Sequence, residues 1–299
     1  MSEYLRSIII DEETPAADGT YTYDLPVNPV SHLILTILAV NEVDEATPEQ
    51  LAALIPNVQV LHRGTTIFQM RAVDLLAFNQ LWLGRTPMLG QMTPAGARVR
   101  FLSLLIPFGR LPYLPGECYP ESRAGELQIQ LTVDIETDDA SIESLQLESI
   151  QLPAASPPQY MKVSTLVSQA TALGAWDIEL PLGNEYLGMM LRSNTIPVVN
   201  TWTATIEAIR LLANNKEYYI SSANWESLYG SRINRGGLEP GFIPDYQQPH
   251  AANYALIDFD PRGNGGFIMP TATLSALTLR VTAGVLDEIR LFPIELVRV

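Results

Sequence analysis

The sequence repeats itself with a period of about half its length, and this repeat limits the fold more than any other feature. Near the start of each copy the matched residues share type and spacing: Gly19, Tyr21, Leu25 and Pro26, then Gly174, Trp176, Leu180 and Pro181. Near the end, the matched series are Ile129, Leu131, Val133 and Leu277, Leu279, Val281. The order is kept while the offset drifts slowly, as insertions in loops would cause. The sequence therefore predicts two similar domains; the alternative is that unrelated β-rich segments share an alternating apolar pattern.

A Pro- and Ala-rich stretch, Pro153–Pro158, lies between the two copies. Proline restricts the backbone, so this stretch is typical of a short, stiff linker. With 299 residues, the chain is long enough for two domains that each bury a substantial core. We therefore predict an N-terminal domain over residues 1–153 and a C-terminal domain over residues 154–299.

Alternation of apolar and polar residues dominates each copy, which is typical of strands that bury one face. It is clearest from Leu127 to Ile135, where every second residue is apolar. In the first copy the pattern predicts eight strands, near residues 4–10, 20–25, 32–40, 57–63, 65–70, 98–107, 126–136 and 142–152. Eight short strands joined by turns predict an all-β fold of two tandem eight-stranded jelly-roll β-sandwiches.

Short helices are expected in the connecting loops. The segment Thr47–Gln50 has the residues of a helix start, with Thr as N-cap, Pro at the first helical position and Gln at the third. A second helix is predicted over Arg71–Leu83, where apolar residues recur at helical spacing. The second copy offers a counterpart at Ser222–Tyr229. A helix at the same place in both copies favours duplication over coincidence.

The charge of the chain limits its partners. The formal net charge is −15 and the N-terminus has no basic arm, so we expect no direct nucleic-acid binding. Charged residues make up only 17% of the chain, against about 25% in a typical soluble domain, which suggests that partners cover much of the surface. The single cysteine, Cys118, excludes an internal disulfide and favours a reducing compartment. The N-terminus also lacks the features of a signal peptide.

The residue patterns of known catalytic and metal sites are absent from the sequence, so we expect no enzyme activity, catalytic residue, cofactor or metal. His32, His62 and His250 are isolated, and one cysteine cannot complete a zinc site. The segment Asp258–Asn264 resembles part of a calcium loop but lacks its distal Glu, and we interpret it as a strand end entering a turn. The acidic run Asp134–Asp139 is expected to be a solvated turn, with a weak calcium site as the alternative.

The duplicated architecture resembles a known family. Two jelly rolls in one chain, each with a helix in the middle and long loops after it, are similar to the double jelly-roll major capsid proteins of tailless icosahedral bacterial viruses and adenovirus. The resemblance covers nearly the whole chain and includes the repeat elements Tyr23–Leu33 and Leu105–Arg110. That family has no catalytic signature, so the resemblance implies a structural protein.

The resemblance also implies how such a chain would assemble. It implies a homotrimer with a nearly hexagonal outline, a capsomer that meets neighbouring capsomers, penton proteins and minor capsid proteins in an icosahedral shell. The protein would fold in the host cytoplasm and reside in the virion. Many viruses of this lineage have an internal membrane beneath the shell, which the N-terminal segment would face.

Apolar and aromatic residues in the long loops are the candidate trimer and capsomer contacts, because interfaces are enriched in such side chains. The candidates are Tyr113, Leu114, Tyr119, Leu238, Phe242 and Tyr246. The alternative is that they pack locally under their own loops.

The alternative function is a carbohydrate-binding or carbohydrate-cleaving protein built on paired jelly rolls. Such a protein would favour Trp and Tyr exposed on one sheet face or in a cleft. Trp82 and Trp225 instead fall within helix candidates, and Trp176 and Trp202 fall on strand candidates. Oligomeric state distinguishes the two functions, because a shell protein requires a stable trimer whereas sugar-binding modules are more often monomers.

Overall fold

The structure, a computed structural model, describes residues 3–41, 46–84, 99–170, 172–196, 203–231, 251 and 253–299. The chain divides into two compact units. The first unit comprises Met1–Gln80, Arg85–Ser164 and Val297–Val299, and the second comprises Leu81–Gly84 and Thr165–Leu296. The predicted domain border after residue 153 lies earlier in the chain than this division, and it stays a prediction.

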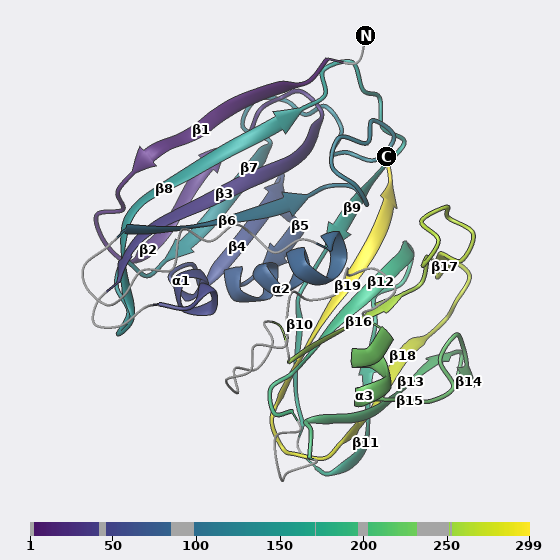
Figure 1. The fold of residues 1–299 in the computed structure, drawn as a ribbon. Helices are drawn as coiled ribbons and strands as arrows, with labels where there is room; N and C mark the ends of the chain where they lie inside the picture. Colours follow the sequence, from purple (N-terminus) through teal and green to yellow (C-terminus); the bar gives the residue numbers. More distant parts are fainter. Residues whose placement is uncertain are drawn as a thin grey trace. The chain divides into compact units, whose positions relative to one another are not determined.

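The first unit is a sandwich of two β-sheets (Figure 1). Its strands are β1 (Leu5–Glu13), β2 (Gly19–Asp24), β3 (Val30–Asn41), β4 (Asn57–His62), β5 (Thr65–Met70), β6 (Val99–Pro107), β7 (Leu127–Val133), β8 (Ala140–Gln151) and β9 (Gln159–Val163). One sheet has the order β1-β8-β3-β6, and the other has the order β2-β7-β4-β5, with β9 beside β5. Strands β1 to β8 coincide with the eight predicted segments.

Four antiparallel pairs define the topology of the first unit: β1 with β8, β2 with β7, β3 with β6 and β4 with β5. The partners in these pairs lie successively closer in the sequence. The strands therefore form one long hairpin that is rolled into two facing sheets, which is a jelly roll. The prediction of an all-β jelly roll is confirmed for this unit.

The alternating pattern places the core of the first unit between its two sheets. In β7, Leu127, Ile129, Leu131 and Val133 are fully buried, whereas the Gln and Thr residues between them are only partly buried. Burying one such aliphatic side chain, instead of leaving it exposed to water, stabilises the folded state by about 1.5–3 kcal/mol. The inward residues of each strand therefore hold the two sheets together.

The second unit repeats this arrangement. Its strands are β10 (Leu166–Gln169), β11 (Gly174–Glu179), β12 (Glu185–Ser193), β13 (Ile206–Ala213), β14 (Lys216–Glu217), β15 (Ala223–Asn224), β16 (Tyr254–Asp258), β17 (Met269–Pro270), β18 (Leu277–Ala283) and β19 (Glu288–Arg298). Antiparallel pairs join β10 to β19, β11 to β18, β12 to β16 and β13 to β14. The nested order matches that of the first unit, so the second unit is a jelly roll too.

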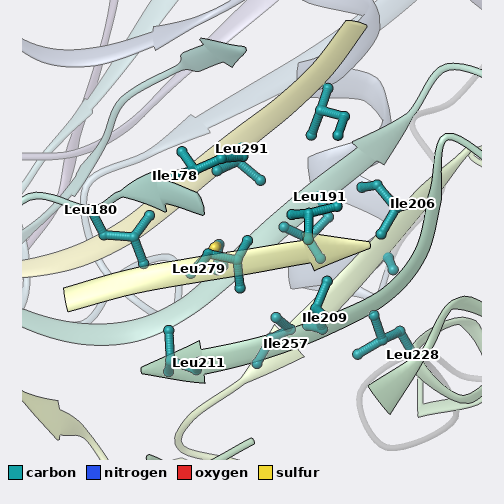
Figure 2. Packing of buried hydrophobic residues seen from close by; sticks show 14 of the residues in the cluster. Ile178, Leu180, Leu191, Ile206, Ile209, Leu211, Leu228, Ile257, Leu279 and Leu291 are labelled. Carbon is teal, nitrogen blue, oxygen red and sulfur yellow. The ribbon is translucent and has the colours of Figure 1, made fainter. Parts of the chain in front are cut away.

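The core of the second unit is built from inward residues of both its sheets (Figure 2). Side chains from four strands lie in this cluster: Leu191 (β12), Ile209 (β13), Leu279 (β18) and Leu291 (β19). Leu279 is the repeat counterpart of Leu131, and both side chains are fully buried. The repeat seen in the sequence therefore reports equivalent core positions.

The first helix, α1 (Pro48–Ala53), begins with the predicted capping box. The Thr47 hydroxyl accepts a hydrogen bond from the Gln50 backbone N–H at 3.2 Å, and the Gln50 side-chain oxygen accepts one from the Thr47 N–H at 2.6 Å. These bonds satisfy two N–H groups that a helix start leaves unpaired. The other helices, α2 (Ala72–Leu83) and α3 (Trp225–Gly230), lie where the sequence predicted them. Among the described residues, no helix is long and apolar enough to cross a membrane.

Candidate assembly surface

The loop between β6 and β7, residues 108–126, holds three of the six predicted contact residues. These three are Tyr113, Leu114 and Tyr119. The other three, Leu238, Phe242 and Tyr246, lie outside the residues that the structure describes, as does His250. The candidate surface is therefore built from the first unit.

An ion pair joins the two sides of the β6–β7 loop. The Arg110 guanidinium Nε donates to the Glu117 carboxylate at 2.8 Å, and the Arg110 backbone N–H donates to the same carboxylate at 3.2 Å. Gln159, at the start of β9, donates its side-chain N–H to Glu117 at 3.1 Å. Glu117 is 3% exposed, so its charge depends on these donors. The two Arg110 contacts close the loop on itself, and the Gln159 contact joins it to β9.

Gly109 allows the loop to close this tightly. A Cβ atom at this position would lie 2.0 Å from the backbone oxygen of Glu117. Only glycine can occupy a site where another backbone approaches so closely.

Tyr113 presents an exposed aromatic ring at the tip of the loop, with 48% of the residue exposed. Its backbone N–H donates to the Ser31 hydroxyl at 2.8 Å, which ties the tip to the start of β3. Its ring lies edge-on to the rings of Tyr4, at 5.4 Å between centroids, and His32, at 5.0 Å. Leu114 beside it is partly buried. Tyr113 is therefore held in place and available to a partner.

Tyr119 lies inside the first unit, at 2% exposed. Its backbone pairs with Val30 in both directions, at 2.8 and 2.9 Å. Its ring contacts those of Phe108, Tyr160 and His62. Burial raises the pKa of the Tyr119 phenol, because the charged form would lose its hydration. In the single chain Tyr119 supports the loop from within, and a contact role for Tyr113, Leu114 or Tyr119 stays a prediction.

The two described histidines and the cysteine occupy structural positions. His32 is buried beside the Ser31 hydroxyl, and burial together with the Arg6 charge lowers its pKa to about 4. His62 Nε2 lies 3.6 Å from the Glu126 carboxylate. Burial raises the pKa of the Cys118 thiol to about 11. Within the described ranges, no group of three or more His, Cys, Asp or Glu side chains is placed to hold a metal.

The acidic segment after β16 forms a turn, in agreement with its interpretation as a strand end. The Asp258 carboxylate accepts a hydrogen bond from the Asp260 N–H at 2.8 Å, and the Asp260 carboxylate accepts one from the Gly265 N–H at 2.9 Å. These carboxylates therefore stabilise the backbone of the turn.

Sequence reasoning missed a second surface, on the outer side of the sheet β1-β8-β3-β6. An apolar stripe runs along two neighbouring strands there. We name it the β3–β6 face, and its residues are Ile34, Leu38, Val40, Val99, Phe101 and Leu105. The signal was present in the sequence, because β3 is apolar at both alternating sets of positions instead of one. A strand of that kind has an apolar side that its own core does not use.

Solved structures similar to this chain include capsid proteins of three viruses. The major capsid protein P2 of bacteriophage PM2 is 12% identical with a TM-score of 0.67, and the match covers 99% of this chain and 98% of that one. The MCP of STIV, the Sulfolobus turreted icosahedral virus, is 12% identical with a TM-score of 0.72, covering 99% and 97%. VP54 of PBCV-1 is 9% identical with a TM-score of 0.68, covering 99% and 94%.

No protein-family model matches the sequence, and no curated protein matches it either. At this level of identity the structural likeness establishes the fold. It extends over both units of this chain and nearly the full length of each neighbour. The chain therefore has the double jelly-roll fold that the sequence predicted.

Proposed function

We propose that this protein is the major capsid protein of an icosahedral virus, and that it forms homotrimeric capsomers with a nearly hexagonal outline. The observation that carries the proposal is the match over 99% of this chain and 98% of the PM2 capsid protein. The comparisons offer no support for the carbohydrate alternative, and Trp82 and Trp225 are buried, so neither is available as a sugar platform.

The physical properties of the chain support a structural role. A net charge of −15 disfavours contact with a genome, so the proposal includes no direct nucleic-acid binding. Two similar units in one chain allow six jelly rolls in a trimer, and the units can diverge where they meet different neighbours. The proposed partners are further capsomers, penton proteins and minor capsid proteins, and an internal membrane faced by the N-terminal segment. The proposed location is the virion, after folding in the host cytoplasm.

The test is the mass of the purified, untagged protein measured by light scattering over a hundredfold range of concentration, followed by electron microscopy. A trimer that persists on dilution, or closed particles, is the expected result. A monomer at every concentration would contradict the proposal, because a shell built of capsomers requires this association.

A further inference from the structure

We infer that the β3–β6 face is the surface on which a second copy of this chain packs. This inference rests on the proposed function, since it names the face through which the capsomer forms. It differs from the loop contacts predicted from the sequence, because it places the contact on the flat side of a sheet.

The register of β3 and β6 places the apolar residues of the face opposite one another. Three cross-strand pairs point outward together: Ile34 with Leu105, Leu38 with Phe101, and Val40 with Val99. The residues between them, such as Leu35 and Leu104, are fully buried and point into the sandwich. Directly opposed side chains on one side of a sheet touch one another. On the outer side the pairs Leu38–Phe101 and Val40–Val99 therefore adjoin, and the pair Ile34–Leu105 lies beyond one polar pair, Thr36–Ser103.

The six residues of the face carry no charge, and Glu148 of β8, which lies beside Ile34 on the same side of the sheet, forms an ion pair with Arg6. The one polar pair on it, Thr36 with Ser103, bonds internally through its hydroxyls at 2.9 Å. Two copies that each carry a charge of −15 repel one another, so close approach is favoured where neither copy places a charge. Val99 is 58% exposed and Phe101 is 38% exposed, although both are apolar. A cluster of exposed apolar side chains of this kind marks an interaction site.

The outer side of the opposite sheet in the same unit gives the contrast. Strands β2 and β7 present polar pairs there: Thr20 with Thr132, Thr22 with Gln130, and Asp24 with Gln128. The last pair is joined by a hydrogen bond at 2.8 Å. This side is suited to water, whereas the β3–β6 face is not.

The equivalent side of the sheet in the second unit differs in its exposure. Strands β12 and β16 occupy the places of β3 and β6 in the jelly-roll order. Met190 pairs with Leu256 across these strands, and neither belongs to the core cluster of the second unit. Nevertheless they are 0% and 5% exposed. The same side of the jelly roll is thus buried within the single chain in the second unit and exposed in the first.

The edge of β6 is closed at Leu105, which favours a contact through the face. Asn79 of α2 makes hydrogen bonds to both the N–H and the carbonyl oxygen of Leu105, each at 2.8 Å. A second copy cannot extend the sheet along this part of β6. Stable interfaces bury about 800 Å² on each partner, so the six side chains would form the apolar centre of a larger contact.

The first test is Phe101→Glu, with Gln130→Glu as the matched control on the outer side of the opposite sheet. Light scattering over a range of concentrations should show that Phe101→Glu raises the concentration for half assembly at least tenfold, while Gln130→Glu leaves it unchanged. Circular dichroism establishes that each variant is folded. A wild-type oligomer that Phe101→Glu leaves intact would overturn the inference alone. A wild-type monomer would overturn the proposed function as well.

A second measurement tests whether another copy covers position 101, even if Phe101→Glu does not fold. Phe101→Cys and Gln130→Cys are each labelled with a soluble maleimide in the assembled protein; the native Cys118 is fully buried. Position 101 is the more exposed of the two in the single chain. Slower labelling at position 101 than at position 130 is therefore expected only if another copy covers it, and faster labelling would overturn the inference.

Discussion

The side-chain amide of Asn79 makes both hydrogen bonds that a neighbouring strand would make to Leu105. Its Nδ2 donates to the Leu105 carbonyl oxygen at 2.8 Å, and its Oδ1 accepts from the Leu105 N–H at 2.8 Å. Strand β6 is the last in its sheet, so its outer edge would otherwise offer unpaired backbone groups to another chain. A single buried side chain of α2 therefore protects this part of the edge.

Replacing Asn79 by leucine tests this role. Asn79→Leu keeps a similar volume but leaves the N–H and C=O of Leu105 without partners, so we expect the free energy of unfolding to fall by about 1–3 kcal/mol. Urea denaturation measures the change. Thr22→Ala, at an exposed position of β2, is the control and should change stability by less than about 0.5 kcal/mol. Equal effects of the two substitutions would mean that the edge is closed in another way.

A second prediction concerns the approach of Gly109 to Glu117. In Gly109→Ala the new Cβ would lie 2.0 Å from a backbone oxygen, so the loop must shift. We expect a loss of about 1–3 kcal/mol, the usual cost of overpacking. Gly116→Ala in the same loop is the control, since a Cβ there has no neighbour within 4 Å. If Gly109→Ala proves as stable as Gly116→Ala, the tight closure of the loop is not required for folding.

The strands and their inward residues could be predicted from the sequence because periodicity reports which residues share a side. In β7 the alternation from Leu127 to Val133 leaves one arrangement that buries the apolar set. The capping box at Thr47 was equally clear, because both of its hydrogen bonds are local. Local patterns and burial act in the same direction at these positions, so the sequence alone is sufficient.

The candidate surface was harder to predict because periodicity does not say which apolar side is covered. Ile34 and Leu35 are adjacent apolar residues of β3, yet only Leu35 faces the core. The aromatic residues of the β6–β7 loop present the same difficulty, since Tyr113 is exposed and Tyr119 is buried. Their difference arises from tertiary contacts, with Val30 and the ring of Tyr160 for Tyr119, that sequence spacing does not encode.

The repeat also hides a difference between the two units. Gly109 and Gly263 occupy matching positions in the two copies, each two residues after a proline, Pro107 or Pro261, but glycine is needed for different reasons. Gly109 makes room for a backbone oxygen, whereas Gly263 adopts a φ of +65°, which other residues reach only with strain. A matched residue in two copies therefore need not have a matched role.

A third prediction compares a buried ion pair with an exposed one. Glu117→Gln removes the charge that faces the Arg110 guanidinium in a site where Glu117 is 3% exposed, so we expect a loss of about 3 kcal/mol. Arg63→Ala breaks the exposed pair with Glu126 and should change the free energy of unfolding little, because solvent screens both charges. Urea denaturation of both variants in the same buffer makes the comparison. A greater loss in Arg63→Ala would contradict this ranking.

The last prediction follows from the burial of His32 beside Ser31 and Tyr113. Burial, with a further contribution from the Arg6 charge, lowers the pKa of His32 from 6.5 to about 4 in the folded protein. Between these two values the unfolded chain binds a proton at His32 and the folded chain does not. Stability from this residue is therefore fully present above pH 6.5 and is lost as the pH falls toward 4, by on the order of 3 kcal/mol.

His32→Gln removes the titrating group and should remove this contribution to the pH dependence. The measurement is the free energy of unfolding of wild type and variant at pH 7.5, 6, 5 and 4.5. We expect the wild-type protein to lose more stability than His32→Gln over this range, because other titrating groups are common to both proteins and cancel in the difference. A difference that stays constant with pH would show that the His32 ring takes up its proton equally in the folded and unfolded chains, and so that it is not held in a buried, neutral state.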